Sequence, residues 1–381
     1  MIYFDNSATT QTLPEAAERA CRTMTQNYFN PAAAYNAAFQ VEKAVNEARA
    51  FAAALIGAEA PEIIYTSGGT ESNNAAIFGT LKAKYGKKRI VTTEIEHPSV
   101  YETVIAAAKL FDAEIAYAPL NRDGAVDLDR LSEVLTPDTA LVSIMHVNNE
   151  LGSVNDLVRI SEKVRALAPT AVFHSDGVQA FMKTDLMKIP ADLYSVSAHK
   201  LHAPKGVGFL LVRNGVHFAG GQIGGGQERN LRSGTTNVPG ILGFDTALRA
   251  YRANAAAWHA QMFRVKQRLY ANLSGLPDVL LNGPSIGEGA PHILNLSFPG
   301  VRGEVLMHAL ERYGVIVSTG SACSAKKQGK NRILNAVGIT GARQESAIRF
   351  SFSPFNTEEE ADTAAAVIEE QLRLLRRYRR R

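Results

Sequence analysis

The residues AVFHSD at positions 171–176 and LYSVSAHK at positions 193–200 share one pattern, an apolar run that ends in an ionisable side chain. The apolar parts, 171–174 and 193–196, are short and rich in branched and aromatic residues, as buried β-strands are. Further strands are predicted at 62–65, 89–93, 114–117, 140–146 and 208–212, with helices such as 71–84, 99–110 and 156–167 between several of them. This alternation predicts an α/β fold, a mostly parallel sheet with helices on both faces.

The pattern changes after residue 212. Residues 218–237 are rich in Gly, Gln, Arg, Ser and Thr and are expected to form an ordered loop before a long helix at 239–273. The remaining predicted elements are strands at 279–281, 293–298, 315–317 and 347–352 and helices at 303–313 and 357–381. We therefore predict a large domain over residues 14–250 and a smaller α+β domain built from residues 1–13 and 251–381.

Composition excludes several classes of protein. The 381 residues include 41 Lys and Arg against 37 Asp and Glu, and a net charge of +4 is too balanced for nucleic acid or membrane as the main partner. Two cysteines cannot form a disulfide framework, which predicts a reducing, cytoplasmic compartment. We find no signal-peptide pattern and no run of 18 apolar residues, so no membrane span is expected.

Polar side chains follow five of the predicted strands. Lys200 follows the strand at 193–196, Asp176 and Gln179 follow 171–174, and His97 follows 89–93. The segments 148–150 (NNE) and 66–70 (TSGGT) follow two more strands. Taken singly, Lys200 is best explained as a solvated loop lysine, whereas Asp176 fits a helix cap as well as a site residue and His97 fits a turn residue as well as a site residue. Ligands of such sheets bind at the carboxyl ends of the strands, so together these residues predict a site.

The chemistry of this set matches one cofactor, pyridoxal phosphate. A lysine amine such as that of Lys200 forms a Schiff base with its aldehyde. A carboxylate such as Asp176 keeps the pyridine nitrogen protonated, and an imidazole such as His97 can stack on the ring. The Ser67-Gly68-Gly69-Thr70 turn leads into a helix, whose N-terminal N–H groups suit a phosphate.

Three more residues stand out by their surroundings. Cys323 lies among small polar residues and is followed by Lys326, Lys327 and Lys330, and nearby cations favour the thiolate. Cys21 lies in a helical segment and is expected to be a buried structural residue. Arg349 lies inside an apolar strand and therefore needs a buried anion, which is either a structural ion-pair partner or a substrate carboxylate.

Motifs spread over the whole chain resemble those of the cysteine desulfurases of the NifS/IscS type, pyridoxal-phosphate enzymes related to the class V aminotransferases. The motifs are FDNSATT at 4–10, TSGGTESNN at 66–74, EH at 96–97, HVNNELG at 146–152, HSDGVQ at 174–179, GGGQER at 224–229, RSGT at 232–235 and GSACS at 320–324. Their number and order make the resemblance specific. It implies the pyridoxal-phosphate-dependent transferase fold of type I and a homodimer with composite sites.

The resemblance also implies a role for each site residue. Lys200 would carry the Schiff base and move protons, His97 would assist acid–base steps, and Cys323 would accept the substrate sulfur as a persulfide. Asp176 would contact the pyridine nitrogen of the cofactor, Gln179 its phenolic oxygen, and Asn148 the cofactor as well. The phosphate would be held by Gly69, Thr70, Ser197 and His199, and Thr235 would reach the phosphate of the second subunit. Asn148 and Arg349 would bind the substrate carboxylate.

The implied reaction converts L-cysteine to L-alanine and passes the sulfur to an iron–sulfur scaffold protein or a tRNA-thiolating enzyme. No resident metal is implied, only contact between the Cys323 persulfide and a nascent iron–sulfur cluster. The polar segment 324–331 is expected to be mobile and to carry Cys323. The alternatives are a class V aminotransferase, a selenocysteine lyase, or a non-catalytic sulfur-relay protein whose basic tail, 376–381, docks an acidic partner.

Overall fold

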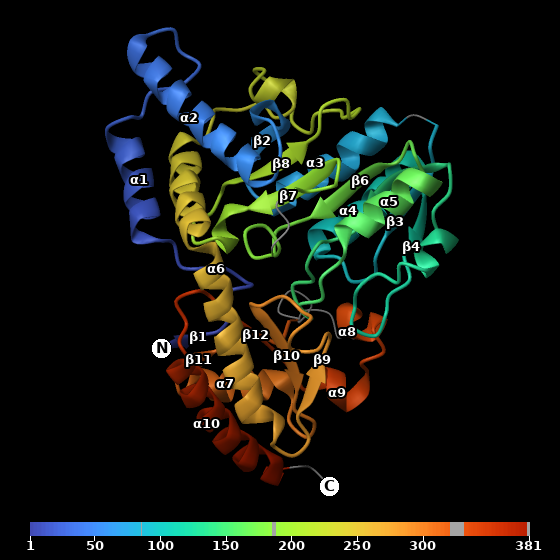
Figure 1. Cartoon of the computed structure of the whole chain (residues 1–381), viewed down its shortest axis with the longest axis vertical. Coiled ribbons are helices and arrows are strands. Elements are labelled where there is room, and N and C mark those ends of the chain that lie inside the picture. The colour runs from blue at the N-terminus through green and yellow to red at the C-terminus, as the bar shows by residue number, and fades with distance from the viewer. Residues whose placement is uncertain (85, 185–187, 321–330, 379–381) are drawn as a thin grey trace.

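The computed structural model describes residues 1–84, 86–184, 188–320 and 331–378, and it is built in two parts (Figure 1). The larger part holds a seven-stranded sheet in the order β2-β8-β7-β6-β5-β3-β4. The strands are β2 (Ile63–Thr66), β3 (Arg89–Thr92), β4 (Glu114–Tyr117), β5 (Thr139–Ser143), β6 (Val172–Asp176), β7 (Leu193–Ser197) and β8 (Gly208–Val212). Only β8 runs antiparallel to its neighbours, which confirms the prediction of a mostly parallel α/β sheet.

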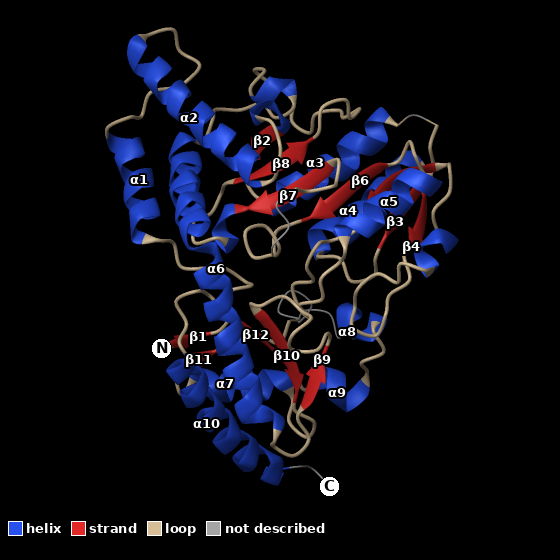
Figure 2. Ribbon diagram, in the orientation of Figure 1, coloured by secondary structure: helices blue, strands red, loops and turns tan. Residues whose placement is uncertain are grey.

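Helices cover both faces of this sheet (Figure 2). They are α1 (Pro14–Thr25), α2 (Asn36–Leu55), α3 (Gly69–Ala83), α4 (Pro98–Phe111), α5 (Leu157–Leu167) and the first part of α6 (Val238–Ser274). Ile63 and Leu211 pack in the core under α2, α5 and α6. Their neighbours Ile64 and Leu210 pack in a second core under α3 and α4, because side chains alternate along a strand. Strands buried on both faces explain why the sequence shows continuous apolar runs rather than alternation.

The smaller part contains two further sheets. In the antiparallel one, β10 (Ile293–Ser297) lies between β9 (Leu280–Asn282) and β12 (Ala347–Ser351). In the other, β1 (Ile2–Tyr3) pairs in parallel with β11 (Val315–Ile316). The helices of this part are α7 (Gly303–Glu311), α8 (Arg332–Ala336), α9 (Gly341–Glu345) and α10 (Glu358–Leu375), and short 3-10 turns lie at Ala60–Glu62, Arg130–Glu133, Ala198–Lys200, Glu228–Asn230 and Arg376–Tyr378.

The long helix α6 connects the two cores. Its residues up to Tyr251 pack in the core of the large sheet, whereas Met262 and Leu269 pack in the core of the smaller part. The predicted change of domain near residue 250 therefore falls inside one continuous helix, and the boundaries 14–250 and 251–381 stay a prediction. Within the described residues, no helix combines the length and the apolar character that crossing a membrane requires.

Two sequence predictions need correction. Cys21 was expected to be buried, but it is exposed, because the buried face of α1 is formed by Ala16, Ala20 and Thr23. The closing helix was expected to run over 357–381, but α10 ends at Leu375 and a 3-10 turn follows to residue 378. Its start is as predicted, since Thr357 and Glu360 form a reciprocal capping box.

Candidate active site

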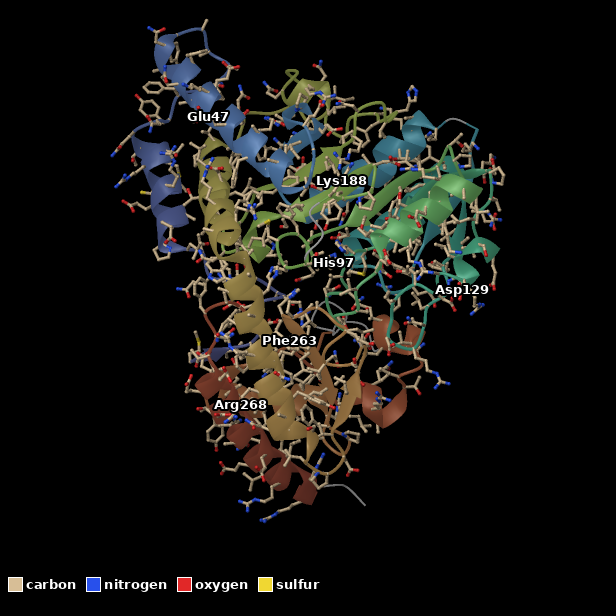
Figure 3. The ribbon with its side chains drawn as sticks, viewed as in Figure 1. Glu47, His97, Asp129, Lys188, Phe263 and Arg268 are labelled. Atoms are coloured by element: carbon tan, nitrogen blue, oxygen red, sulfur yellow. The ribbon has the colours of Figure 1, made fainter. Side chains whose placement is uncertain are left out.

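A cavity of about 370 Å³ lies where the carboxyl ends of the large-sheet strands face the smaller part. His97, which Figure 3 labels between the two parts, lies in its wall. The other predicted residues in the wall are Gly69, Thr70, Asp176, Gln179, Ser197, His199, Lys200 and Arg349. Nine of the predicted residues, distant in sequence, thus line one space.

A chain of hydrogen bonds holds the carboxylate of Asp176. Its Oδ2 accepts from the amide Nδ2 of Asn73 at 2.8 Å, and its Oδ1 accepts from the backbone N–H of Val178 at 2.9 Å. The same Asn73 nitrogen lies 2.8 Å from the hydroxyl oxygen of Ser99. That hydroxyl is 2.8 Å from Nδ1 of His97. Asn73 and Ser99 were not predicted, although Asn73 lies in the TSGGTESNN motif.

His97 caps the N-terminus of α4. Its Nδ1 accepts the backbone N–H of Ser99 at 3.1 Å, so the proton of the neutral ring is on Nε2. Burial lowers the pKa of His97 and favours this neutral form, and the nearby Asp176 opposes the shift. The ring is therefore neutral near pH 7, with Nε2–H as a donor.

Lys200 ends the 3-10 turn that follows β7. Its Nζ donates to the carbonyl oxygens of Ser7 at 2.6 Å and Ala8 at 2.7 Å. The carbonyl of Ser7 also accepts from Nε2 of Gln179 at 3.0 Å. The FDNSATT motif near the N-terminus therefore lies along the site, where it holds two of the predicted residues through backbone oxygens.

The start of α3 forms a cradle beside Lys200. An open pocket there is lined by Gly69, Thr70, Ser197 and His199. A Cβ at Gly69 would lie 2.6 Å from Cγ2 of Val178, so the close approach of the helix start requires glycine. Burial lowers the pKa of His199 to about 4, which leaves this ring neutral. The N-terminal N–H groups of α3, with these side chains, suit an anion such as a phosphate.

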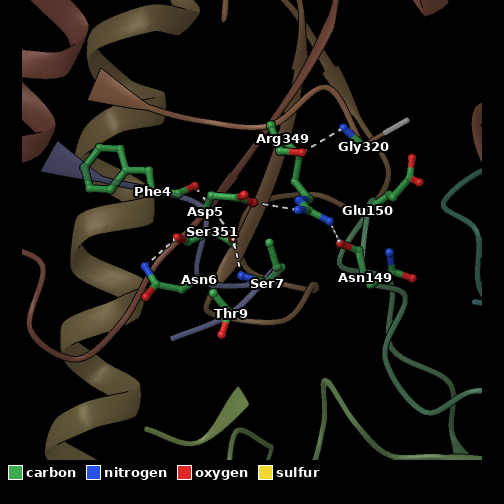
Figure 4. Close-up of polar contacts among 12 residues, drawn as sticks. Phe4, Asp5, Asn6, Ser7, Thr9, Asn149, Glu150, Gly320, Arg349 and Ser351 are labelled. Atoms are coloured by element: carbon green, nitrogen blue, oxygen red, sulfur yellow. Dashed lines mark hydrogen bonds and ion pairs between the residues drawn. The ribbon is translucent and has the colours of Figure 1, made fainter. Parts of the chain in front are cut away.

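Arg349 projects from β12 into the other end of the cavity (Figure 4). Its Nη2 lies 2.7 Å from Oδ1 of Asp5, and its Nη1 donates to the carbonyl of Asn149 at 3.0 Å. Its Nε is buried and has no partner within the described residues. Arg349 thus has the structural ion-pair partner that its position required, and it still faces the cavity.

Asn148 does not line the cavity, and its expected contact with cofactor and substrate stays a prediction. Its Nδ2 donates to the carbonyl of Ile95 at 2.9 Å, and its Oδ1 accepts the N–H groups of Glu150 and Leu151. These bonds engage both the nitrogen and the oxygen of the Asn148 side-chain amide, and they stabilise a turn. The next residue, Asn149, lines the cavity instead, and its Oδ1 is buried without a partner in the described structure.

Two predicted residues are not placed in this cavity. Thr235 is exposed and lines neither the cavity nor the cradle. Cys323, with most of the predicted mobile segment 324–331, lies outside the described residues. Gly320, three residues before Cys323, lines the cavity, and three residues of extended chain span at most about 11 Å. No group of metal-binding side chains occurs in the described ranges.

Known proteins are similar to this chain over nearly its whole length. The family model described as aminotransferase class-V matches residues 2–363. A cysteine desulfurase of Trichormus azollae is 39% identical over 99% of this chain and 94% of its own length. The cysteine desulfurase IscS of Pseudomonas aeruginosa is 39% identical over 98% of this chain and 93% of its own length. A solved structure described as a NifS-like protein superposes with a TM-score of 0.91 at 34% identity, covering 98% of this chain and 99% of that one.

Proposed function

The chain belongs to the class-V aminotransferase family, and we propose on this premise that it is a cysteine desulfurase that depends on pyridoxal phosphate. It converts L-cysteine to L-alanine and takes up the sulfur on Cys323. The observation that carries the proposal is the convergence of Lys200, Asp176 and His97 on one cavity beside the glycine-lined start of α3.

The residues present fit pyridoxal phosphate. The cradle at Gly69 and Thr70 would take the phosphate, and a side chain at Gly69 would clash with Val178 and displace the start of α3. Asp176, fixed by Asn73 and Val178, would face the pyridine nitrogen, and Gln179 would donate to the phenolic oxygen. When bound, this cofactor supplies an aldehyde for an amine and a ring that withdraws electrons from Cα.

The side chains of the protein supply the proton transfers of the reaction. The amine of Lys200, which donates to the Ser7 and Ala8 carbonyls, would hold the cofactor by its aldehyde, and with substrate bound the freed amine would take and return the proton at the substrate Cα. Neutral His97 has a proton on Nε2 to donate to a developing negative charge.

Arg349 orients the substrate by its carboxylate. The unpaired Nε of Arg349 is a donor, whereas the unpaired Oδ1 of Asn149 is an acceptor, which suits the amino group of the substrate rather than its carboxylate. A substrate carboxylate competes with Asp5 for the guanidinium, which can donate to two carboxylate oxygens side by side.

Sulfur transfer requires an acceptor thiol within reach of the substrate Sγ. The only cysteines of the chain are Cys21, which is exposed on α1, and Cys323. Because Gly320 lies in the cavity wall, Cys323 is the acceptor in our proposal. A persulfide there passes to an iron–sulfur scaffold protein or to a tRNA-thiolating enzyme.

The proposal also includes a homodimer in the cytoplasm, in which Thr235 of each subunit completes the phosphate site of the other. The exposed position of Thr235 supports it, since a side chain exposed in one chain is accessible to a second one. We propose no nucleic acid as a direct partner and no membrane.

The test is an assay of the holoenzyme with L-cysteine and a thiol reductant. We expect alanine and sulfide in equal amounts. Transfer of the amino group to a keto acid without sulfide would instead indicate an aminotransferase, and activity with selenocysteine alone would indicate a selenocysteine lyase. A protein that binds no pyridoxal phosphate would be the non-catalytic sulfur-relay protein.

A further inference from the structure

We propose that Arg232 is a positioning residue for the phosphate site, because it neutralises Glu71, a carboxylate in the cradle wall that would otherwise repel the phosphate. The inference rests on the proposed function, in which the cradle at the start of α3 takes the phosphate of the cofactor. It concerns an ion pair for which the proton transfers and the sulfur transfer have no use.

Glu71 places a negative charge beside the expected phosphate. It lies in the first turn of α3 and lines the cradle together with Gly69 and Thr70. The N-terminal N–H groups of a helix favour a carboxylate and a phosphate alike, so both anions are drawn to the same end of α3. A phosphate ester carries a charge of about −1.5 to −2 at pH 7 and repels a carboxylate nearby. The cradle therefore needs a group that offsets Glu71.

The carboxyl group of Glu71 is ionised near pH 7. Burial raises its pKa, but hydrogen bonds from Arg232 and Ser67 act in the opposite direction, and the pKa lies below its ordinary value. The backbone N–H of Ser67 donates to Oε2 of Glu71 at 2.7 Å. The same carboxylate therefore shapes the turn that leads into α3 and brings a charge to it.

Arg232 supplies the opposite charge from a distant segment of the chain. Its Nε donates to Oε1 of Glu71 at 2.8 Å, and its Nη2 donates to Oε2 at the longer distance of 3.4 Å. The two side chains are 24% and 23% exposed, so solvent screens this pair less than a pair on the open surface. The guanidinium faces both oxygens of the carboxylate and offsets its charge.

The backbone around Arg232 is fixed within its own loop and against the sheet. Arg232 forms a β-bridge with Gln222, and the N–H of Ser233 donates to the carbonyl of Gln222 at 3.1 Å. The side chain of Gln222 donates back to the carbonyl of Ser233 at 2.7 Å. Glu228 of the same loop accepts the N–H of Tyr65 on β2 at 2.9 Å. The guanidinium therefore extends from a fixed point, which suits a residue that positions others.

The charges in the cradle wall show what the ion pair changes. The acidic and basic side chains among its lining residues are those of Glu71, His199 and Lys205. His199 is neutral, because burial lowers its pKa to about 4. When Arg232 pairs with Glu71, the exposed Lys205 leaves the wall with a net positive charge. Without Arg232, Glu71 would cancel that charge, and the phosphate would meet a wall with no net charge.

The alternative role of the ion pair is structural, that of fastening the loop at 218–237 to α3. A fastening role predicts that loss of Arg232 weakens binding of every ligand of the cavity alike, whatever the charge at position 71. The proposed role predicts an effect that depends on the phosphate of the ligand and on the carboxylate of Glu71.

The experiment measures the dissociation constants of pyridoxal phosphate, and of pyridoxal, which lacks the phosphate, for the full chain freed of cofactor. The variants are Arg232→Ala, Arg232→Lys, Glu71→Gln and the double variant Arg232→Ala/Glu71→Gln. Glutamine keeps an oxygen that can accept the N–H of Ser67 but has no charge. The control is Arg89→Ala, because Arg89 is also 24% exposed and pairs with Glu114 at the start of β3, away from the carboxyl ends of the strands.

We expect Arg232→Ala to weaken binding of pyridoxal phosphate by about 10- to 100-fold, the size of one uncompensated charge beside an anion at intermediate dielectric, and to change binding of pyridoxal little. Arg232→Lys should recover most of the affinity because it keeps the charge. Glu71→Gln should bind pyridoxal phosphate at least as tightly as the wild type, and the double variant nearly as tightly. Arg89→Ala should bind both ligands normally.

Unchanged binding in Arg232→Ala, or equal weakening for the two ligands, would overturn the proposal. A double variant that binds pyridoxal phosphate no better than Arg232→Ala would do the same, because the effect would then not arise from the charge of Glu71. A wild-type chain that binds no pyridoxal phosphate would instead refute the proposed function.

Discussion

In the proposed function, Lys200 is the residue on which the chemistry depends most directly. In Lys200→Ala no other described amine that lines the cavity is left to react with the cofactor or to move the Cα proton. We expect alanine formation to fall by at least about 10³-fold, the combined size of nucleophilic and proton-transfer contributions. The measurement is alanine release under saturating cysteine. Lys188→Ala, which removes an exposed lysine, serves as the control, and appreciable turnover by Lys200→Ala would refute the assignment.

Arg349 tests whether a buried guanidinium binds substrate or only stabilises the fold. We expect Arg349→Ala to raise the KM for cysteine strongly, since losing a buried charge-assisted contact weakens binding by about 2–5 kcal/mol. The matched control is Arg343→Ala, because Arg343 bonds Asn282 and the carbonyl of Leu281 away from the cavity. If Arg349→Ala unfolds more easily while its KM is unchanged, Arg349 serves only its ion pair with Asp5.

At the scale of elements, the turn between β3 and α4 contains a fully buried carboxyl, that of Glu96. Burial raises its pKa to about 8, Asp176 adds to the rise, and hydrogen bonds from Thr93 and the N–H of Met145 oppose it together with Arg332. The folded protein therefore holds a proton that the unfolded chain releases above its ordinary pKa of 4.5. The contribution of Glu96 to the free energy of unfolding is therefore fully present below pH 4.5. It is lost as the pH rises from there toward 8.

The variant Glu96→Gln cannot titrate at this position. Between pH 5 and pH 9 the free energy of unfolding of the wild type should fall as Glu96 loses its stabilising proton. We expect the fall in the variant to be smaller than that in the wild type, and the difference to exceed about 1 kcal/mol. Urea unfolding at several pH values measures the difference. Glu94→Gln, a change of the exposed neighbour, should follow the wild type. Parallel curves for Glu96→Gln and wild type would show that Glu96 ionises normally.

The bounds of the strands show how much of the fold the sequence predicts. Strands β4 and β8 have the predicted bounds, and β7 extends one residue further, because apolar runs of this length have no other stable place than a buried sheet. The polar residues after strands β6 and β7 line one cavity, as predicted, because parallel strands end at the same edge of the sheet.

What the sequence did not show depends on contacts between distant segments. Asp5 pairs with Arg349 across 344 positions, and Asn73 bonds Asp176 across 103. Which of Asn148 and Asn149 lines the cavity depends on which amide bonds the turn, and two adjacent identical residues do not reveal this in the sequence. Cys21 was assigned to the wrong face of α1, whose buried positions are Ala16, Ala20 and Thr23.

At the scale of the whole molecule, the proposed homodimer can be tested by complementation. Lys200→Ala and Thr235→Ala subunits should each be impaired as pure dimers, the second through weaker cofactor binding. In a mixed dimer, one site combines an intact Lys200 with an intact Thr235 from the partner subunit. Mixing after subunit exchange should therefore restore about a quarter of wild-type activity for random pairing, one intact site in half of the dimers. No recovery, together with an active monomer in sedimentation, would refute composite sites.

The most direct test of the whole account replaces each of the two cysteines and follows the sulfur. Cys323→Ala leaves Lys200, Asp176 and His97 untouched, so the holoenzyme should keep its bound cofactor and its absorbance change with L-cysteine. It should form no persulfide and release no alanine. Cys21→Ala should behave as wild type and change stability by no more than about 0.5 kcal/mol, since Cys21 is exposed. Persulfide labelling with alanine release measures both variants, and normal alanine release by Cys323→Ala, or a label on Cys21, would contradict the account.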